Sequence, residues 1–252
     1  AWLEGDWSVV EGAFFDRWSN RNIVKPFTFP DWWARIRAFD WGYAAPFSVG
    51  WWAVASDDTR MADGVIVPRG ALVRYREWYG SSGKPNEGLR LTAEEVAEGI
   101  RDRERGERIS HGIADPSIFR EDGGPSIAER MGRIIGRQRA ADNTRVGRAG
   151  AFGGWDQMRA RIAGDATGPQ LVVFDTCHDF IRTVPVLQHD PLRPEDLDTR
   201  AEDHVADETR YACLSRPLPA RSPPRPADPP DLSDWDRRWP KPPPEQLSWK
   251  VM

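Results

Sequence analysis

Two aspartates in this chain each follow a short apolar run that has the pattern of a buried strand. Asp40 follows residues 36–39, and Asp115 follows residues 109–114 and precedes a proline. A carboxylate at the end of a buried strand is costly unless it meets a cation, although an aspartate close to a glycine is also common in ordinary turns. A third acid, Asp207, lies in a segment with the pattern of a helix. His204 lies three residues before it, on the same helical face.

These acids indicate metal chemistry if the fold brings them together. The carboxylates of Asp40 and Asp115 would come side by side if their two strands pair in parallel. Clustered carboxylates repel one another without a counter-charge, and Mg²⁺ and Mn²⁺ prefer oxygen ligands. Two such ions roughly 3.5–4 Å apart can activate a water and stabilise the leaving oxygen of a phosphodiester. Glu77 also comes near the end of an apolar run, and we interpret it as structural.

Hydrophobic periodicity and capping motifs predict the elements that would position the acids. Apolar and alternating runs predict an antiparallel meander of three strands over 36–40, 47–55 and 71–79, with further short strands over 109–114 and 171–174. Three capping boxes predict helices over 93–105, 127–135 and 200–214; the boxes pair Thr92 with Glu95, Ser126 with Glu129, and Thr199 with Glu202. Residues 176–183 are predicted as a short helix and 184–189 as an extended piece.

The chain has 252 residues and is 39% hydrophobic with 13 Trp, which is enough for one large domain or two small ones with a sizeable core. We divide it into an N-terminal arm or linker (1–35), a main domain (36–215) and a Pro-rich tail (216–252). The aromatic residues of the arm either pack over the main domain or touch a missing neighbour; they are Trp2, Trp7, Phe14, Phe15 and Trp18. The tail is expected to be disordered or a draped polyproline segment.

Charge and cysteine content limit the classes of function. The net charge of −4 does not by itself indicate a nucleic-acid partner, and no apolar run approaches the roughly 20 residues that span a membrane. Cys177 and Cys213 are interpreted as buried thiols in a reducing cytosol. The segment from Arg130 to Arg161 is locally basic, with flexible glycines. It is either a solvated surface or a phosphate-contacting loop, for which Arg145 and Arg148 are the candidates.

Several motifs, in their order and spacing, resemble the C-terminal nuclease domain of the large terminase subunit of tailed bacteriophages. The resemblance covers roughly residues 1–216. It rests on Phe39-Asp40-Trp41-Gly42, on Val49-Gly50-Trp51-Trp52, on Ala114-Asp115-Pro116-Ser117-Ile118-Phe119, and on a closing His-x-x-Asp-x-x-Arg-Tyr segment that runs from His204 to Tyr211.

This resemblance implies a ribonuclease H-like α/β fold. In that fold a mixed central sheet has an antiparallel meander followed by parallel strands, with helices on both faces. It also implies a metal-dependent endonuclease that cuts concatemeric double-stranded DNA, with Asp40, Asp115 and Asp207 as ligands of two Mg²⁺ or Mn²⁺ ions. His204 would lie beside the metals as an occasional ligand or water-orienting group, or it is simply a residue of the helix face. Asp203 competes with Asp207 as the third acid, and Asp207 is preferred because the family places its acid three residues after the His.

The resemblance is incomplete in one respect. The chain has no G-x-x-x-x-G-K-[ST] phosphate loop, so we expect the ATPase upstream in the full-length chain or on another chain. The start at Ala1 without Met suits an excised fragment. Expected partners are double-stranded DNA, the portal protein and the small terminase subunit, without a membrane, in the cytoplasm of the bacterial host. The source would be a phage, a prophage or a gene transfer agent.

Two alternatives to this function stay open. One is another ribonuclease H-like enzyme, such as a junction resolvase or a transposase. The other is a non-catalytic domain that docks on the portal protein or the small terminase subunit through its Trp- and Pro-rich tail.

Overall fold

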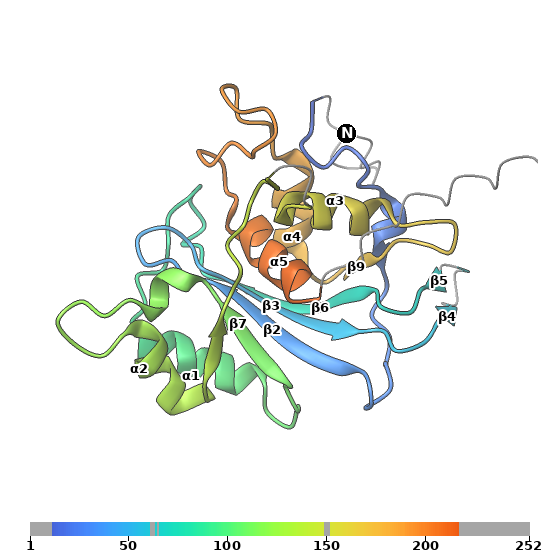
Figure 1. The fold of residues 1–252 in the computed structure, drawn as a ribbon. Helices are drawn as coiled ribbons and strands as arrows, with labels where there is room; N and C mark the ends of the chain where they lie inside the picture. Colours follow the sequence, from blue (N-terminus) through green and yellow to red (C-terminus); the bar gives the residue numbers. More distant parts are fainter. Residues whose placement is uncertain (1–11, 61–63, 65, 149–151, 217–252) are drawn as a thin grey trace, which may run out of the picture. The chain divides into compact units, whose positions relative to one another are not determined.

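A seven-stranded mixed sheet forms the centre of the fold, with the strand order β1-β9-β6-β3-β2-β7-β8 (Figure 1). The computed structural model describes residues 12–60, 64, 66–148 and 152–216. Trp2, Trp7, Gly150 and nearly all of the Pro-rich tail therefore lie outside the described residues. The strands of the sheet are β1 (Ile23–Val24), β2 (Ala34–Asp40), β3 (Ser48–Val54), β6 (Leu72–Tyr79), β7 (His111–Ala114), β8 (Gln138–Ala140) and β9 (Leu171–Phe174). Two short strands, β4 (Thr59–Arg60) and β5 (Ile66–Val67), form a separate ribbon.

The pairing of these strands confirms the predicted meander and the parallel strand beside it. β2 pairs antiparallel with β3, which pairs antiparallel with β6, with a register shift between Trp51 and Trp52. β7 pairs in parallel with β2, so that Phe39 lies opposite Ala114. Asp40 and Asp115 each follow these partners directly. The two acids therefore leave neighbouring strands at the same edge of the sheet.

Helices cover both faces of the sheet (Figure 1). Two helices lie on one face, α1 (Ala93–Arg103) and α2 (Ile127–Ile135), and three on the other, α3 (Gly154–Ala163), α4 (His178–Thr183) and α5 (His204–Ser215). The capping boxes at Thr92 and Ser126 are both present, so these two predictions are confirmed.

The third capping-box prediction is wrong. The last helix begins at His204 with Asp203 as its N-cap residue, four residues later than predicted. Glu202 instead accepts hydrogen bonds from Arg182 and from the backbone N–H of Asn86. The predicted extended piece after α4 is also partly wrong, since residues Val184–Val186 form the 3₁₀ turn η3.

Two elements of the basic segment were not predicted. β8 adds an edge strand beside β7, and α3 begins immediately after Gly153. Gly153 and Gly154 permit close packing rather than flexibility there, because a Cβ on Gly154 would lie against the side chain of Arg210. The prediction that these two glycines make the segment flexible is therefore wrong.

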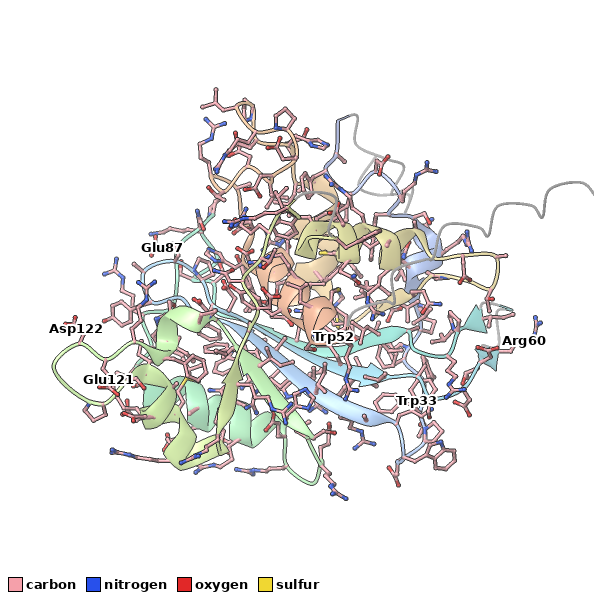
Figure 2. The ribbon with its side chains drawn as sticks, viewed as in Figure 1. Trp33, Trp52, Arg60, Glu87, Glu121 and Asp122 are labelled. Carbon is pink, nitrogen blue, oxygen red and sulfur yellow. The ribbon has the colours of Figure 1, made fainter. Side chains whose placement is uncertain are left out.

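The described part of the arm completes the core. Phe14, Phe15 and Trp18 are buried, and β1 extends the sheet beyond β9. On β3, Trp52 points toward α5 (Figure 2), where its indole N–H donates to Glu208. Within the described ranges, no helix is both long enough and apolar enough to cross a membrane.

Candidate functional site

Asp40 is the buried centre of the candidate site. Its side chain is only 10% exposed at the end of β2. One carboxylate oxygen lies 3.2 Å from Nδ1 of His204, and the other accepts a hydrogen bond of 3.4 Å from the hydroxyl of Tyr211. The pKa of Asp40 is raised to about 7, chiefly by burial; the negative charges of Asp207 and Asp115 add to this effect, and the hydrogen bond from His204 opposes it. The acids predicted to meet therefore act on one another electrostatically.

His204 is held between Asp40 and a loop residue. Its Nε2 lies 3.1 Å from Oδ1 of Asn86, in the loop between β6 and α1. Asn86 has a φ of 57°, in the left-handed region that asparagine tolerates better than most residues. Burial alone would lower the pKa of His204, but the hydrogen bond and the charge of Asp40 raise it. The histidine is thus fixed from two sides, by Asp40 and by Asn86.

Asp115 is held by its own turn. Pro116 begins the short 3₁₀ helix η2 (Pro116–Phe119), and the Asp115 carboxylate accepts hydrogen bonds from the backbone N–H of Ser117 at 2.9 Å and from its hydroxyl at 2.6 Å. The backbone N–H of Asp115 donates to the carbonyl of Phe39 at 2.9 Å, which ties the turn to β2. The half-buried carboxylate of Asp115 therefore has a defined position beside the end of β2.

Asp207 is paired with two arginines. Its Oδ1 accepts from Nε and Nη2 of Arg210 at 3.1 and 2.6 Å, and its Oδ2 lies 3.5 Å from Nη1 of Arg145. Asp203 is buried at the start of α5, and burial raises its pKa to about 6, with the charge of Asp207 adding to the effect. Because the charge of Asp207 acts on Asp40, Asp207 stays the preferred third acid.

The two basic candidates have different surroundings. Arg145 contacts Asp196 and Asp207, whereas Arg148 is exposed. Glu77, which we interpreted as structural, accepts hydrogen bonds from the backbone N–H groups of Asp179 and Phe180 at the start of α4. That contact supports its structural interpretation.

The donor chemistry of the site suits a hard divalent cation, since Asp40 contacts the imidazole of His204 and feels the charges of the Asp115 and Asp207 carboxylates. As the side chains are placed, however, no three His, Cys, Asp or Glu residues of the described ranges lie close enough together to hold a metal ion. Each carboxylate is paired with a protein donor instead: Asp40 with His204, Asp115 with Ser117, and Asp207 with Arg210. The residues fit the cation in type and charge, and joint ligation would require side chains to exchange these partners.

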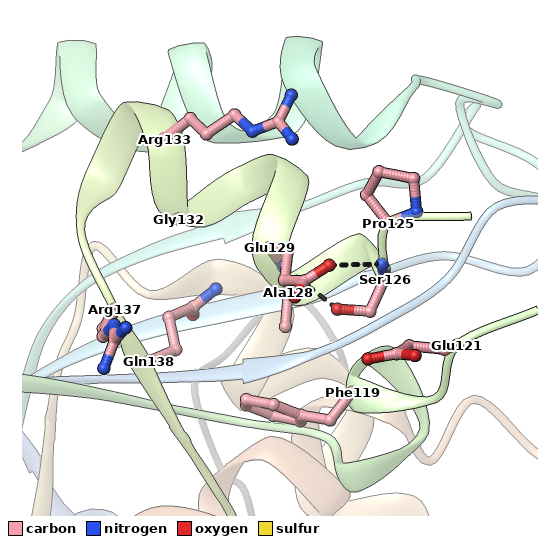
Figure 3. Close-up of a pocket in the computed structure, with 10 residues that line it drawn as sticks. All are labelled: Phe119, Glu121, Pro125, Ser126, Ala128, Glu129, Gly132, Arg133, Arg137 and Gln138. Atoms are coloured by element: carbon pink, nitrogen blue, oxygen red, sulfur yellow. Dashed lines mark hydrogen bonds between the residues drawn. The ribbon is translucent and has the colours of Figure 1, made fainter.

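Two surface cavities lie apart from the three acids. One, of about 590 Å³, lies beside η2, α2 and β8 and includes Arg133 and Arg137 in its lining; the two hydrogen bonds of the Ser126–Glu129 capping box border it (Figure 3). The other, of about 400 Å³, is lined partly by Lys84 and Pro85, close to Asn86 in the chain.

Sequence reasoning missed Asn86 and Asn143 at this site. Asn143 accepts from Nη2 of Arg210 at 2.8 Å and lies 3.5 Å from the hydroxyl of Tyr211. Both asparagines lie in loops, and no motif marks either one. Tyr211 and Arg210 do belong to the closing motif, which is the one signal that indicates them.

Comparison with solved structures identifies the fold. The large terminase of the thermophilic bacteriophage D6E superposes with a TM-score of 0.59 at 17% identity, over 84% of this chain and 46% of that chain. Its complex with ATP-γ-S gives a TM-score of 0.60 at 17% identity, over 83% and 46%. The P22 large terminase nuclease domain superposes with a TM-score of 0.55 at 17% identity, over 81% of this chain and 92% of that domain.

These similarities confirm the predicted ribonuclease H-like fold, which is the fold of the terminase nuclease domain. The chain spans about half the length of the D6E terminase, and it matches nearly all of the P22 nuclease domain. No protein-family model and no curated protein sequence matches the chain.

Proposed function

We propose that this chain is a metal-dependent endonuclease that cuts double-stranded DNA, with Asp40, Asp115 and Asp207 as ligands of two Mg²⁺ or Mn²⁺ ions. The observation that supports it best is the meeting of Asp40 and His204 where β2 ends, with the charges of Asp115 and Asp207 acting on the same carboxylate. This arrangement lies in a fold shared with a terminase nuclease domain.

The roles of the side chains follow from their contacts. Asp40 is buried and feels the charges of the two other acids, and Asp40, Asp115 and Asp207 would hold the ions. The bound ions would supply an activated water and stabilise the leaving oxygen of the phosphodiester. His204, held between Asp40 and Asn86, would help to orient the attacking water beside Asp40. Tyr211 donates to Asp40 and keeps its carboxylate in place.

The biological setting that we propose is the cutting of concatemeric phage DNA during genome packaging. The ATPase would lie upstream in the full-length chain, consistent with a chain that spans about half of the D6E terminase. The portal protein and the small terminase subunit would be its partners in the cytoplasm of the bacterial host. Since the described residues include no evident base-reading element, we expect weak sequence preference.

Cleavage of supercoiled plasmid tests the proposal directly. We expect nicked and linear products with Mn²⁺ and none with EDTA. Asp40→Asn should abolish cleavage, whereas Asp122→Asn, which changes an exposed acid in the loop before α2 (Figure 2), should not. Full activity of the Asp40→Asn variant would refute the site. A preference for branched junctions over linear duplex would favour a resolvase. The absence of cleavage, together with tight binding to a portal protein, would favour a docking domain.

A further inference from the structure

Arg145 is anchored at one end of its guanidinium group and incompletely paired at the other. Nε donates to Asp196 at 2.9 Å, and the guanidinium carbon lies 5.0 Å from the ring centre of Trp155. Nη1 lies 3.5 Å from Asp207, which is longer than an ordinary charged hydrogen bond. Nη2 is buried and has no hydrogen-bond partner among the described residues. An unpaired buried donor is costly, so this end of Arg145 is suited to a further acceptor.

The two oxygens of Asp207 are held differently. Oδ1 is fixed by Arg210, whose side chain is 1% exposed and is itself held by Asn143 and the carbonyl of Thr144. The other oxygen, Oδ2, lies 3.5 Å from Nη1 of Arg145. If Arg145 gained another anionic partner, Oδ2 would become free while Arg210 kept the rest of the side chain in position.

We propose that Arg145 is a positioning residue that couples DNA binding to metal binding by exchanging Asp207 for a phosphate of the DNA backbone. This inference rests on the proposed nuclease function. A guanidinium group suits a phosphate better than a distant carboxylate, because it offers two parallel N–H donors. Asp196 and Trp155 keep the group in place during the exchange. The freed Oδ2 of Asp207 then becomes available as a metal ligand.

Electrostatics gives the coupling its direction. Before DNA binds, the positive charge of Arg145 beside Asp207 opposes the approach of a divalent cation. A bound phosphate supplies negative charge to Arg145 and removes that opposition. Metal and DNA should therefore strengthen each other's binding, and thermodynamic linkage requires the effect to be reciprocal. Without DNA, the acids would stay paired with protein donors, as they are in this structure.

The test measures Mn²⁺ affinity of the full chain by electron paramagnetic resonance, so that it does not depend on cleavage. Arg145→Gln should bind Mn²⁺ more tightly than the wild type in the absence of DNA, by a factor between about 5 and 150, the usual range for coupling between two sites. Arg133→Gln is the matched control, because Arg133 is exposed on α2 across the sheet from α5 (Figure 1). It should leave Mn²⁺ affinity unchanged.

A second arm adds a short duplex, with the measurement corrected for Mn²⁺ bound by the duplex alone and with the duplex checked for cleavage by gel after each measurement. The duplex should tighten Mn²⁺ binding in the wild type and have little effect in Arg145→Gln. Because Arg145→Gln leaves Asp196 without its cation, the double variant Arg145→Gln/Asp196→Asn is measured beside it, with melting temperatures for all variants. The double variant should show the same gain in Mn²⁺ affinity.

The outcomes separate this inference from the proposed function. Equal Mn²⁺ affinities in wild type and both Arg145 variants, with and without DNA, would overturn the coupling while leaving the nuclease proposal intact. Failure of the wild type to bind Mn²⁺ even with the duplex present would overturn both.

Discussion

Glu208 and Arg74 form an ion pair that is sealed between α5 and the sheet. Their side chains are 0% and 1% exposed, and Glu208 also accepts a hydrogen bond of 2.8 Å from the indole of Trp52. Glu208 directly follows Asp207, so the pair fastens α5 to the sheet at the level of the candidate site. It thereby fixes the positions from which His204 and Tyr211 reach Asp40.

Breaking this pair should destabilise the protein strongly. In Glu208→Leu, the remaining carboxylate partner of Arg74 among the described residues is Glu77, at 3.4 Å. We expect a loss of about 3–5 kcal/mol in the free energy of unfolding. The double variant Arg74→Met/Glu208→Leu removes both charges and should lose much less. Urea denaturation of the three proteins measures both effects. A single variant as stable as the wild type would contradict this view of α5.

Gly50 on β3 lies against the Glu208–Arg74 ion pair, so a substitution there tests how tightly the pair is packed. A Cβ at this position would lie against the carboxylate of Glu208 and the guanidinium of Arg74. Gly50→Ala should therefore cost about 1–3 kcal/mol, as overpacking of a filled core does. Gly132→Ala is the control: Gly132 lies within α2 with open space around it, and the change should stabilise by up to about 1 kcal/mol. Two variants with the same denaturation midpoint would refute the packing argument.

The sequence predicted the elements whose signals are local. The apolar run before Asp40 and the capping boxes at Thr92 and Ser126 are each recognisable from a few consecutive residues. The meander and two helices were therefore predicted closely. β8 is only three residues long and includes the exposed Arg139, and pairing with β7 alone makes it a strand. The start of α3 was missed because Gly153 and Gly154 were interpreted as flexible, while close packing requires them.

In the candidate site, too, the residues marked by a local motif were predicted and those placed by distant contacts were missed. The strand-end acids were predicted from the apolar runs before them and the closing helix motif from its resemblance to the terminase family, and the structure brings Asp40 together with His204. The contact of Asn86 depends on a left-handed backbone conformation in a loop, which no spacing predicts. The role of Glu202 was mistaken because Arg182, which lies 20 residues earlier, competes for its carboxylate.

Glu77 should affect stability without affecting metal affinity. Its carboxylate accepts hydrogen bonds of 2.7 and 3.2 Å from the backbone N–H groups of Asp179 and Phe180, so it caps α4. Glu77→Ala should cost at least about 1–2 kcal/mol, the usual effect of losing a helix cap, because it also removes the 3.4 Å contact with Arg74. Mn²⁺ affinity should stay at the wild-type value in the same samples. A large loss of Mn²⁺ affinity with unchanged stability would instead make Glu77 part of the site.

The two thiols should be unreactive in the folded protein. Burial raises the pKa of both Cys177 and Cys213 to about 12, and the thiolate is the reactive form. At a mildly alkaline pH, a thiol reagent such as dithionitrobenzoate should therefore label neither cysteine in the native protein and both in urea. Rapid labelling of a native thiol would show that its surroundings open to solvent.

The metal-free protein should lose stability as the pH rises toward neutrality. Burial raises the pKa of Asp40 from 3.8 to about 7, so between these values the folded state holds a proton that the unfolded chain has released. The free energy of unfolding then falls as the pH increases through this window. The pKa of His204 is also raised in the folded state. The stability that His204 contributes is therefore fully present below its pKa in the unfolded chain, and it is lost as the pH rises through its pKa in the folded protein. Both groups act in the same direction.

Melting temperatures in EDTA, measured between about pH 5 and pH 7.5, check this prediction. Asp40→Asn keeps the size of the side chain but removes both its titration and the charge that raises the pKa of His204, so the variant should show a flatter pH dependence than the wild type. Acids with lowered pKa values, such as Asp198 beside Arg200, lose their contribution only at lower pH and do not interfere. Parallel curves for the two proteins would mean that Asp40 is not the group that retains the proton. A higher melting temperature at pH 7.5 than at pH 5 in both would contradict the direction itself.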